Sequence, residues 1–508
     1  MKGFGDNYKS RKKIKKKPQH DKEQIVKKAI NFHSRGNIPE ATKYYQYCIK
    51  QKFNDCRVFS NYGLILQNMG KLKEAEFSYR KSISLNPDFA NAHLNLGNIL
   101  RDLGRLEEAK LSTLKAIKLN PNLVQAHTNF GVILKNLGKY KEAEVSFRKA
   151  IALNPNFEDA HYNLGNLLIN LGKFQEAEVS LLKVLELNPD FVMAYNSLSL
   201  LKYSENNQLW QDLLFAKNIL NNKLPKEKID IYFARANVHH KQKNYKNSSK
   251  NLQLANNLKL DLRPTNADSL INKSNILFNE SDKMECNNFI CKKFTESIFI
   301  VGMPRSGSTL LESILSMKND VCDLGEINIL EESFVEYKKT KEKINLAEIY
   351  SKKIKNKTQL NITTNKWLYN YQYAGIIANQ IFNAKIIHCY RNPLDNILSI
   401  YRAHFASGNE YSSSLEDCAN VYLDQEEIMT KYKSRFKFKI YNLNYESLVI
   451  DPNKEIKSLI SWLGWEWSDS YLTPHLNSRA ISTRSNIEVR SPINSNSIGG
   501  WKNYRDML

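Results

Sequence analysis

Two glycines in the middle of the chain frame a loop whose residues could bind a phosphate group. Gly302 and Gly307 lie between an apolar run, Ile298 to Val301, and a second apolar run, Leu310 to Leu315. The first run predicts a buried parallel strand, and the second predicts the start of a helix. A glycine-framed loop between a strand and a helix directs backbone N–H groups and the helix N-terminus at one point, and this geometry binds phosphate.

The same loop differs at one position from the pattern of nucleoside triphosphatases, G-x-x-x-x-G-K-S/T. Ser308 stands where that pattern has a lysine, whose ammonium group reaches the β- and γ-phosphates. The loop therefore suits a phosphate group but is poorly suited to ATP or GTP hydrolysis. Its candidate phosphate-binding residues are Arg305, Ser306, Gly307, Ser308 and Thr309.

A second strand–loop–helix segment offers a cation and a hydroxyl for another phosphate. Ala384 to Cys389 predicts a strand, and Leu394 to Phe405 predicts a helix. Arg391 lies where the strand ends, at the edge where open parallel sheets bind ligands, and Ser399 follows about two helical turns later. An arginine fork and a hydroxyl form a good site for a phosphate monoester. A surface ion pair is the alternative interpretation of Arg391.

The composition limits the class of protein. With 508 residues the chain exceeds one hydrophobic core, so we expect two to four domains. No stretch approaches the roughly 18 apolar residues of a membrane-spanning helix, and the basic N-terminus lacks the apolar core of a secretory signal. Seven cysteines are scattered without a C-x-x-C pair, so we expect reduced thiols, a cytoplasmic location and no zinc site. No acidic or histidine cluster suggests another metal.

The net charge of +22 is concentrated in part at the N-terminus. Residues 1–28 hold eleven Lys or Arg and three acids. This composition predicts a solvated, disordered tail over residues 1–23. A nucleic-acid-binding arm is the alternative, but the segment offers few rings for stacking on bases, so a nucleic-acid partner is disfavoured.

A 34-residue repeat precedes both phosphate-binding segments, and it resembles the tetratricopeptide repeat over residues 24–262. Two glycines and an alanine recur in each unit: a first glycine and the alanine let two helices approach closely, and a second glycine turns the chain between them. Stacked units of this kind form an all-α superhelix. The first glycines are Gly63, Gly97, Gly131 and Gly165, and the second are Gly36, Gly70, Gly104, Gly138 and Gly172.

An asparagine recurs two residues before each first glycine, on the concave face of such repeats. A side-chain amide both donates and accepts, so a row of amides can bind the backbone of an extended peptide. The array resembles the repeats of O-linked N-acetylglucosamine transferase, where a comparable row is known. The alternative is that asparagine is a common repeat residue without a ligand. The row consists of Asn61, Asn95, Asn129 and Asn163.

The chain after residue 262 alternates strands and helices. Asp261 to Thr265 is interpreted as a junction, and Ala267 to Phe278 as a helix of the second domain. Phe436 to Asn442 predicts a strand and Pro452 to Leu463 a helix. Such alternation predicts a parallel sheet with helices on both faces, so the expected fold is an all-α repeat array followed by a P-loop-like α/β domain over residues 263–508.

The two phosphate-binding segments, about 85 residues apart, together resemble those of sulfotransferases that use 3′-phosphoadenosine 5′-phosphosulfate (PAPS). The nearest pattern is a bacterial sulfotransferase family fused to tetratricopeptide repeats and related to tyrosylprotein sulfotransferase. The resemblance implies that the loop after Ile298–Val301 binds the 5′-phosphosulfate and that Arg391 and Ser399 bind the 3′-phosphate. It also implies a catalytic base at Glu326 and charge stabilisation by Arg305 and Lys366, the latter at the start of a helix.

The resemblance extends to a tyrosine near the nucleotide and to a C-terminal lid. The matching positions are Tyr445, and Ser485 and Arg490 within Ser482 to Trp501. Relatives carry a basic residue before the C-terminal tryptophan, and this chain has Gly500 there. The glycine predicts a flexible chain at this position of the lid.

These observations predict a PAPS-dependent sulfotransferase without a metal, whose repeats recruit a protein or peptide acceptor. One alternative is a nucleoside or sugar kinase, which Ser308 and the Arg391–Ser399 pair disfavour. The other is a non-catalytic nucleotide-binding scaffold. His404, on the helix after Ser399, is the alternative base, whereas His388 and Cys389 are expected to be buried in their strand. The sequence leaves the acceptor open among tyrosine, glycan and small molecule.

Overall fold

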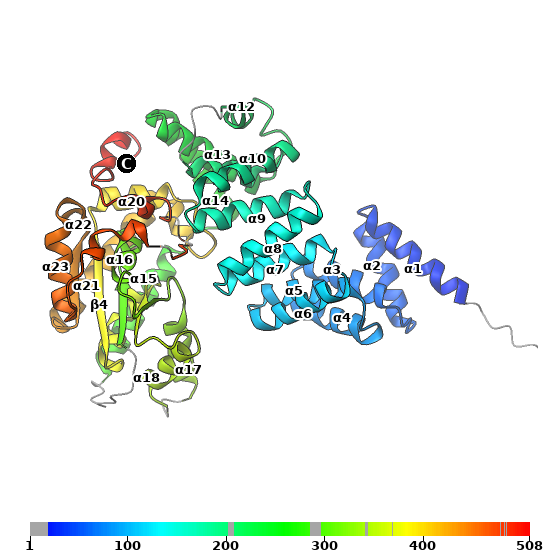
Figure 1. The fold of residues 1–508 in the computed structure, drawn as a ribbon, viewed down its shortest axis with the longest axis horizontal. Coiled ribbons are helices and arrows are strands. Elements are labelled where there is room, and N and C mark those ends of the chain that lie inside the picture. The colour runs from blue at the N-terminus through cyan, green and yellow to red at the C-terminus, as the bar shows by residue number, and fades with distance from the viewer. Residues whose placement is uncertain are drawn as a thin grey trace, which may run out of the picture. The chain divides into compact units, whose positions relative to one another are not determined.

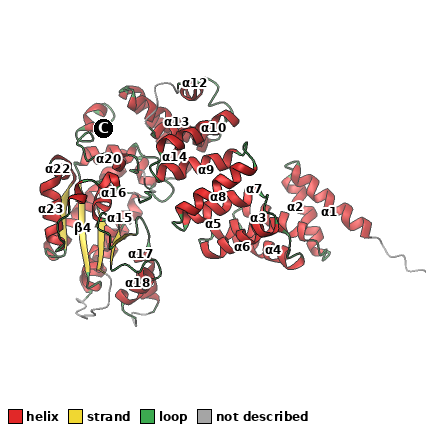
Figure 2. Cartoon of the chain, viewed as in Figure 1, coloured by secondary structure: helices red, strands yellow, loops and turns green. Residues whose placement is uncertain are grey.

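The structure of the chain is a computed structural model. It describes residues 19–201, 208–284, 296–340, 344–367, 369–477, 479–481, 483 and 485–508. The chain forms two compact units, one reaching to Leu164 and the other spanning Gly165–Leu508. Within the described residues, strands occur only from Glu296 to Asn444, and all other regular elements are helical (Figure 2).

Paired helices of similar length make up the repeat region, as the 34-residue period predicts. The unit that reaches to Leu164 holds α1 to α8 and part of α9, and the second unit begins within α9 and holds α10 to α14. The helices are α1 (Gln19–Ser34), α2 (Ile38–Lys50), α3 (Cys56–Asn68), α4 (Leu72–Leu85), α5 (Ala90–Asp102), α6 (Leu106–Leu119), α7 (Val124–Asn136), α8 (Tyr140–Leu153), α9 (Glu158–Asn170), α10 (Phe174–Leu187), α11 (Val192–Leu200), α12 (Leu209–Phe215), α13 (Pro225–Lys241) and α14 (Tyr245–Leu262).

The two glycines of each repeat have the roles that the sequence predicts. A Cβ added at Gly131 would lie 2.6 Å from Cε1 of Phe147, so only glycine allows these two helices to approach so closely. The second glycine, exemplified by Gly138 with φ of 76°, adopts the left-handed conformation that ends one helix before the next begins.

The predicted disordered tail is shorter than expected at its C-terminal end. Helix α1 begins at Gln19, and Glu23 forms an ion pair with Arg57 at 2.8 Å. The five residues from 19 to 23 are therefore helical, because α1 packs against the next repeat. Residues 1–18 lie outside the described residues.

A five-stranded, wholly parallel sheet forms the core of the α/β part, in the order β2-β3-β1-β4-β5. This arrangement confirms the predicted fold class. Because β1 lies between β3 and β4, the chain leaves β1 and β4 next to each other at the carboxyl edge, which is where parallel sheets bind ligands. The strands are β1 (Glu296–Val301), β2 (Val321–Asp323), β3 (Ile362–Asn365), β4 (Ala384–Tyr390) and β5 (Ile440–Asn444).

Helices cover both faces of this sheet, because alternate strand residues point to opposite sides. Phe299 and Ile386 face one core, with α15 (Ala267–Lys283), α17 (Ile329–Lys339), α18 (Leu346–Lys355), α19 (Ala374–Gln380) and α21 (Leu415–Arg435). Ile300 and Ile387 face the other core, with α16 (Ser308–Leu315), α22 (Tyr445–Ile450) and α23 (Pro452–Leu463). Figure 1 shows α22 and α23 next to each other beside β4.

Most predicted elements of the α/β part are present, with some shifted ends. Helix α23 matches its prediction residue for residue, and α20 (Pro393–Tyr401) ends before Phe405. Strand β5 begins at Ile440 rather than at Phe436, because Phe438 is 91% exposed in a turn. The short strands β2 and β3 were not predicted. None of the described helices combines the length and the apolar character that crossing a membrane requires.

Candidate functional site

The loop between β1 and α16 lies at the carboxyl edge of the sheet, and its backbone is shaped by close contacts. A Cβ at Gly302 would lie 2.1 Å from the carbonyl oxygen of Cys389, and one at Gly307 would lie 2.4 Å from Cδ2 of Tyr445. Both glycines have positive φ, of 141° and 99°. Only glycine therefore lets the loop sit against β4 and α22. Ser308 and Thr309 begin α16, whose N-terminus points its free N–H groups into the loop.

Arg305 lies at the centre of this loop in a left-handed conformation, with φ of 68°. A non-glycine residue held there costs of order 1–3 kcal/mol, and strain of this kind is concentrated at functional sites. Its guanidinium donates from Nε to Ser399 Oγ at 3.0 Å and from Nη1 to Ser485 Oγ at 2.5 Å, and Nη2 pairs with Glu488 Oε1 at 2.7 Å. The structure thus brings together Arg305, Ser399 and Ser485, three of the candidate residues from the sequence.

Arg391 extends from the end of β4 towards the same loop. Its Nη1 donates to the carbonyl of Arg305 at 3.1 Å, and its Nη2 donates to the carbonyl of Ser497 at 2.6 Å. The guanidinium carbon lies 4.7 Å from the centroid of the Tyr445 ring, and the Tyr445 hydroxyl lies 2.7 Å from Ser497 Oγ. Burial lowers the pKa of Arg391, which is only 8% exposed. Arg305, Arg391 and Tyr445 therefore form one cluster.

Two donors in this cluster have no acceptor among the described residues. Ser306 Oγ and Arg391 Nε are buried without a hydrogen bond, although Arg391 Nε lies 4.0 Å from Glu446 Oε1. Buried donors left unpaired cost about 1–3 kcal/mol each, so a ligand oxygen that accepts from them would be stabilised. The residues present fit a phosphate group at this place.

Glu326 and Lys366 form a separate charged group next to the loop. Lys366 Nζ donates to Glu326 Oε1 at 2.7 Å; the lysine side chain is 1% exposed, and that of Glu326 is 35% exposed. Lys366 follows β3 directly, rather than starting a helix as the resemblance implies, and the next helical turn begins at Asn370. A buried ammonium ion beside a reachable carboxylate can hold a charge and accept a proton.

A buried carboxylate, Glu312, supports this pair from α16. Its Oε1 accepts from the Gly325 N–H at 3.2 Å and from the Thr364 hydroxyl at 3.0 Å, and its Oε2 lies 3.9 Å from Lys366 Nζ. Arg479 Nη1 lies 3.4 Å from the same Oε2. Sequence reasoning missed both residues. The signal for Glu312 is a lone acid in the apolar start of the helix; for Arg479 there is none, because its partner Asp323 is over 150 residues away.

The segment 479–490, which we call the strap, joins the phosphate loop to the end of helix α9. Thr483 Oγ1 lies 3.3 Å from Thr309 Oγ1, beside the contact of Ser485 with Arg305. At its other side the Ile481 N–H donates to the carbonyl of Asn170 at 2.9 Å, and Asn486 Nδ2 donates to Asn170 Oδ1 at 3.2 Å. Ser482, in the predicted lid, lies outside the described residues.

Arg490 belongs to the strap and does not join the cluster of Arg305 and Arg391. Its Nη groups donate to the carbonyls of Asn477, Arg479 and Asn170, the last at 3.4 Å. Its side chain also lies against Gly172. Arg490 is thus bonded to backbone, and its role as a nucleotide contact stays a prediction.

The C-terminal segment is held on α20 despite its two glycines. The Gly499 N–H donates to Asp395 Oδ2 at 2.7 Å, and the Trp501 N–H donates to Asp395 Oδ1 at 3.0 Å. A Cβ at Gly500 would meet only Asp395 Oδ1 at 3.7 Å, an ordinary contact. The segment therefore lies beside Arg391 through Ser497, with Asp395 as its anchor.

The two histidines lie apart from the charged groups described above. His388 is fully buried in β4, as predicted, with Nε2 2.8 Å from Gln425 Nε2. Cys389 is also buried, and burial raises the pKa of its thiol. His404, the alternative base, stacks on Phe233 of α13 with ring centroids 4.6 Å apart.

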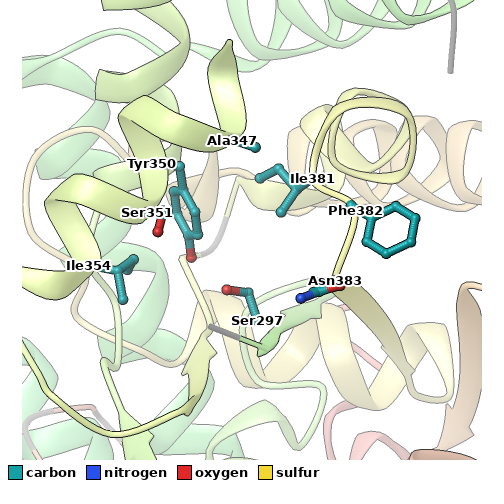
Figure 3. Close-up of a pocket in the computed structure, with 8 residues that line it drawn as sticks. All are labelled: Ser297, Ala347, Tyr350, Ser351, Ile354, Ile381, Phe382 and Asn383. Atoms are coloured by element: carbon teal, nitrogen blue, oxygen red, sulfur yellow. The ribbon is translucent and has the colours of Figure 1, made fainter. Parts of the chain in front are cut away.

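A small cavity lies at the opposite end of the sheet (Figure 3). Its volume is about 10 Å³, space for about one water molecule. Tyr350 points its hydroxyl towards Ser297 at the start of β1, far along the strand from Gly302. The cavity is too small for a substrate. Within the described residues no group of His, Cys, Asp and Glu is arranged to hold a metal ion.

Comparison with protein families identifies both parts of the chain. Residues 297–469 match the model described as "Sulfotransferase family". Models of the tetratricopeptide repeat match residues 57–89, 90–123, 113–145 and 136–199. The chain thus carries a sulfotransferase-family domain after tetratricopeptide repeats.

Similar individual proteins cover only parts of the chain. An uncharacterized protein of Aquifex aeolicus (strain VF5) is 29% identical over 235 residues, which are 42% of this chain and 31% of that protein. Among solved structures, a tetratricopeptide repeat protein from Parabacteroides merdae is 20% identical with a TM-score of 0.36, covering 47% of this chain and 93% of its own. A thermophilic repeat protein from Thermus thermophilus is 19% identical with a TM-score of 0.31, covering 34% of this chain and 94% of its own.

Proposed function

We propose that residues 263–508 form a PAPS-dependent sulfotransferase domain that transfers a sulfuryl group to a hydroxyl acceptor. The observation that carries the proposal is the cluster of Arg305 and Arg391, with unpaired donors, at the carboxyl edge of β1 and β4. This cluster lies inside the segment that matches the sulfotransferase family. When bound, PAPS supplies an activated sulfuryl group on its 5′-phosphate.

The loop holds the 5′-phosphate, and β4 with α20 holds the 3′-phosphate. Backbone N–H groups of 306–309, with the hydroxyls of Ser306, Ser308 and Thr309, donate to the 5′-phosphate at the start of α16. Arg391 Nε and Ser399 Oγ donate to the 3′-phosphate. The Tyr445 ring lies beside Gly307 and Arg391 and orients the nucleotide.

Glu326 acts as the general base. Its carboxylate, on a side chain that is 35% exposed, accepts the proton of the acceptor hydroxyl as the new O–S bond forms and the bond from sulfur to the phosphate oxygen breaks. Lys366 holds Glu326 in place and, with Arg305, stabilises the negative charge that develops on the sulfuryl group and the leaving oxygen. Ser485 and Glu488 fix the guanidinium of Arg305 in the strained loop.

The repeats recruit a protein or peptide acceptor, and neither a membrane nor a nucleic acid is part of the proposal. The four asparagines of the predicted row are half-buried on their helices. Two of their amides already donate within the chain: Asn95 to Ser60 Oγ at 3.4 Å, and Asn163 to the Asp159 carbonyl at 2.8 Å. A peptide that binds the row therefore replaces these two intramolecular hydrogen bonds with bonds to its own backbone. The cytoplasmic location is proposed from the scattered cysteines, of which the described five are free.

Transfer of ³⁵S from labelled PAPS to components of a cell lysate tests this function and finds the acceptor. We expect a labelled macromolecule whose labelling requires the intact Arg391. Labelling that also appears with Arg391→Ala, or ATP-dependent phosphorylation in place of sulfation, would contradict the proposal. Arg505→Ala, which removes an exposed arginine on the C-terminal segment, is the matched control.

A further inference from the structure

A groove crosses the amino edge of the sheet, at the opposite end from the phosphate loop. Its volume is about 960 Å³, at the upper end of the roughly 300–1,000 Å³ of ligand sites. The residues at the beginnings of β3, β1 and β4, with the residue just before β5, line it: Ile362, Glu296, Ala384 and Lys439. Because β1 has six residues, each rising about 3.3 Å, the groove lies about 20 Å from Gly302 and is separate from the proposed nucleotide site.

Three exposed apolar side chains surround this groove, each on a connection that leads into a strand. Leu360 precedes β3, Phe382 precedes β4 and Phe438 precedes β5, and these side chains are 40%, 43% and 91% exposed, respectively. In Figure 3 the Phe382 ring points away from Tyr350 and from the small cavity. Single exposed apolar residues are ordinary, but several that gather around one hollow mark an interaction surface.

The groove carries a positive charge. Among the described residues that line it, Glu296 is the only acid, and its Oε1 lies 3.1 Å from Lys385 Nζ. The ammonium groups of Lys385 and Lys439 also donate to backbone carbonyls, at 2.5 Å and 2.6 Å, which carry only partial charges. Lys355, at the end of α18, is exposed and forms no ion pair within the described residues. The groove therefore attracts an anionic occupant.

The span of the groove fits a short extended chain. Neighbouring strands lie about 4.8 Å apart, so the beginnings of β3, β1, β4 and β5 span about 14 Å. An extended segment of roughly four to five residues has this length. Gln359 and Asn361 bring side-chain amides to the groove, and an amide can both donate to and accept from the backbone of such a segment. A hollow of this size suits a segment that enters it better than it suits the flat surface of a membrane.

We propose that this groove is a docking site for a partner protein, which binds through an extended acidic segment that carries aromatic or aliphatic side chains. The apolar side chains of the segment pack on Phe382 and Phe438, and its carboxylates pair with Lys355 and Lys439. The inference goes beyond the proposed function and does not depend on nucleotide binding. It adds a second contact surface for proteins to the one proposed for the repeats.

The test uses the full-length chain and a fluorescein-labelled hexapeptide, Asp-Phe-Glu-Leu-Asp-Phe, as the probe. Two counter-peptides change one property each: Lys-Phe-Lys-Leu-Lys-Phe reverses the charge, and Asp-Ser-Glu-Ser-Asp-Ser removes the apolar side chains. In fluorescence anisotropy, the first peptide should bind with a dissociation constant at least about tenfold below that of either counter-peptide. Saturating adenosine 3′,5′-bisphosphate should leave that constant unchanged, because the two sites are separate.

Two pairs of variants locate the bound peptide. Phe438→Ala and Lys355→Glu should each weaken its binding about 3- to 10-fold, and both replace exposed side chains, so the core stays intact. Ile450→Ala and Lys454→Glu are the matched controls, because they replace an exposed apolar residue and an exposed lysine that follow the carboxyl end of β5. These two variants should bind the peptide as the wild type does.

Three results would overturn the docking site. The first is equal binding of the three peptides, and the second is binding that Phe438→Ala and Lys355→Glu leave intact. The third is displacement of the peptide by adenosine 3′,5′-bisphosphate, which would place the peptide at the phosphate loop. Sedimentation with phosphatidylserine vesicles tests the other occupant: vesicle binding that both groove variants lose, without binding of the peptide, would replace the protein partner with an anionic lipid surface.

Discussion

The repeats before Leu164 and the helices from α10 to α14 are both paired helices, but they differ in what their side chains contact. In the first unit each helix pair packs on its neighbours, as Tyr79 of α4 does by sharing a cluster with Leu96 and Ile99 of α5. In the second unit α13 and α14 pack on the α/β part: Ile229, Phe233 and Leu252 share a cluster with Leu398, Tyr401 and Tyr504.

The difference explains where the repeat pattern degenerates. Asn256 Nδ2 donates to the carbonyl of Tyr401 at 3.0 Å, and His240 bonds the Tyr504 hydroxyl. These polar residues break the repeat consensus because they contact another fold instead of a further repeat. The last helices therefore behave as part of the same unit as the α/β fold, and under the proposed function the first repeats are the part that recruits an acceptor.

Deleting whole helices should have the largest effect on solubility and on nucleotide binding. The predicted boundary after residue 262 implies that removal of residues 1–260 leaves a folded domain. The contacts of α13 and α14 imply the opposite: that deletion exposes the cluster around Tyr401 and Tyr504, whereas deletion of residues 1–157 leaves it covered. We expect the shorter deletion to stay soluble and bind adenosine 3′,5′-bisphosphate, and the longer one to aggregate. Size-exclusion chromatography measures the aggregation of the two truncated proteins, and calorimetry measures their nucleotide binding. If both stay soluble and bind equally well, the predicted domain boundary after residue 262 is correct.

Truncation of two buried phenylalanines, one in each unit, should have a smaller effect than deletion of whole helices. Phe147 lies in α8 of the first unit, and Phe233 lies in α13 of the second; both are almost fully buried. Truncation to alanine should lower the free energy of unfolding by about 3–5 kcal/mol in each case. Only Phe233→Ala should also weaken nucleotide binding, because its ring supports His404 after α20. Denaturant-induced unfolding, monitored by fluorescence, measures the stability of both variants, and calorimetry measures their nucleotide binding. A loss of binding in Phe147→Ala would contradict the distinction between the two units.

Acid should destabilise the second unit through His240. Burial lowers the pKa of His240 to about 3, with Arg402 and Lys241 adding to the shift. An unfolded histidine has a pKa near 6.5, so the stabilisation is fully present above about pH 6.5 and is lost as the pH falls towards 3. The loss is at most about 1.4 kcal/mol per pH unit for this half-buried ring.

His240→Gln keeps a hydrogen bond to Tyr504 and should flatten this pH dependence. Thermal melts of both proteins between pH 4.5 and 7.5 measure the difference, with His127→Gln in the first unit as the control. If the melting temperatures of the wild type and of His240→Gln fall equally as the pH is lowered, His240 is not the cause of the destabilisation by acid.

Removal of one hydrogen bond to the strap should have the smallest effect on nucleotide affinity. Asn170→Ala removes the side-chain bond to Asn486 but keeps the backbone bond to Ile481, so the loss is that of one hydrogen bond, about 0.5–1.5 kcal/mol. Because the strap also holds Arg305 through Ser485, we expect a two- to tenfold weaker affinity for adenosine 3′,5′-bisphosphate. Asn129→Ala, in the first unit, should leave the affinity unchanged. Hydrogen exchange of residues 479–490 reports the same change independently.

Local sequence signals predicted the fold and part of the site. The 34-residue period and the strand–loop–helix pattern predicted the repeats, the parallel sheet and the two segments that carry Arg305, Arg391 and Ser399, because each depends on near neighbours in the chain. Glu312 and Arg479 were missed because they are joined only by tertiary contacts. The ends of β5 and α1, and the backbone partners of Arg490, escaped prediction for the same reason.

The rate of sulfuryl transfer by Glu326→Gln tests the proposed mechanism most directly. Glutamine keeps the size and the hydrogen bond of Glu326 towards Lys366 but cannot accept a proton. In single-turnover transfer from saturating PAPS to the identified acceptor, the rate should fall about 10²- to 10⁴-fold. The affinity for adenosine 3′,5′-bisphosphate should stay within about twofold of that of the wild type. A near-wild-type rate for Glu326→Gln, with loss of activity in His404→Ala, would contradict the assignment and transfer the role of base to His404.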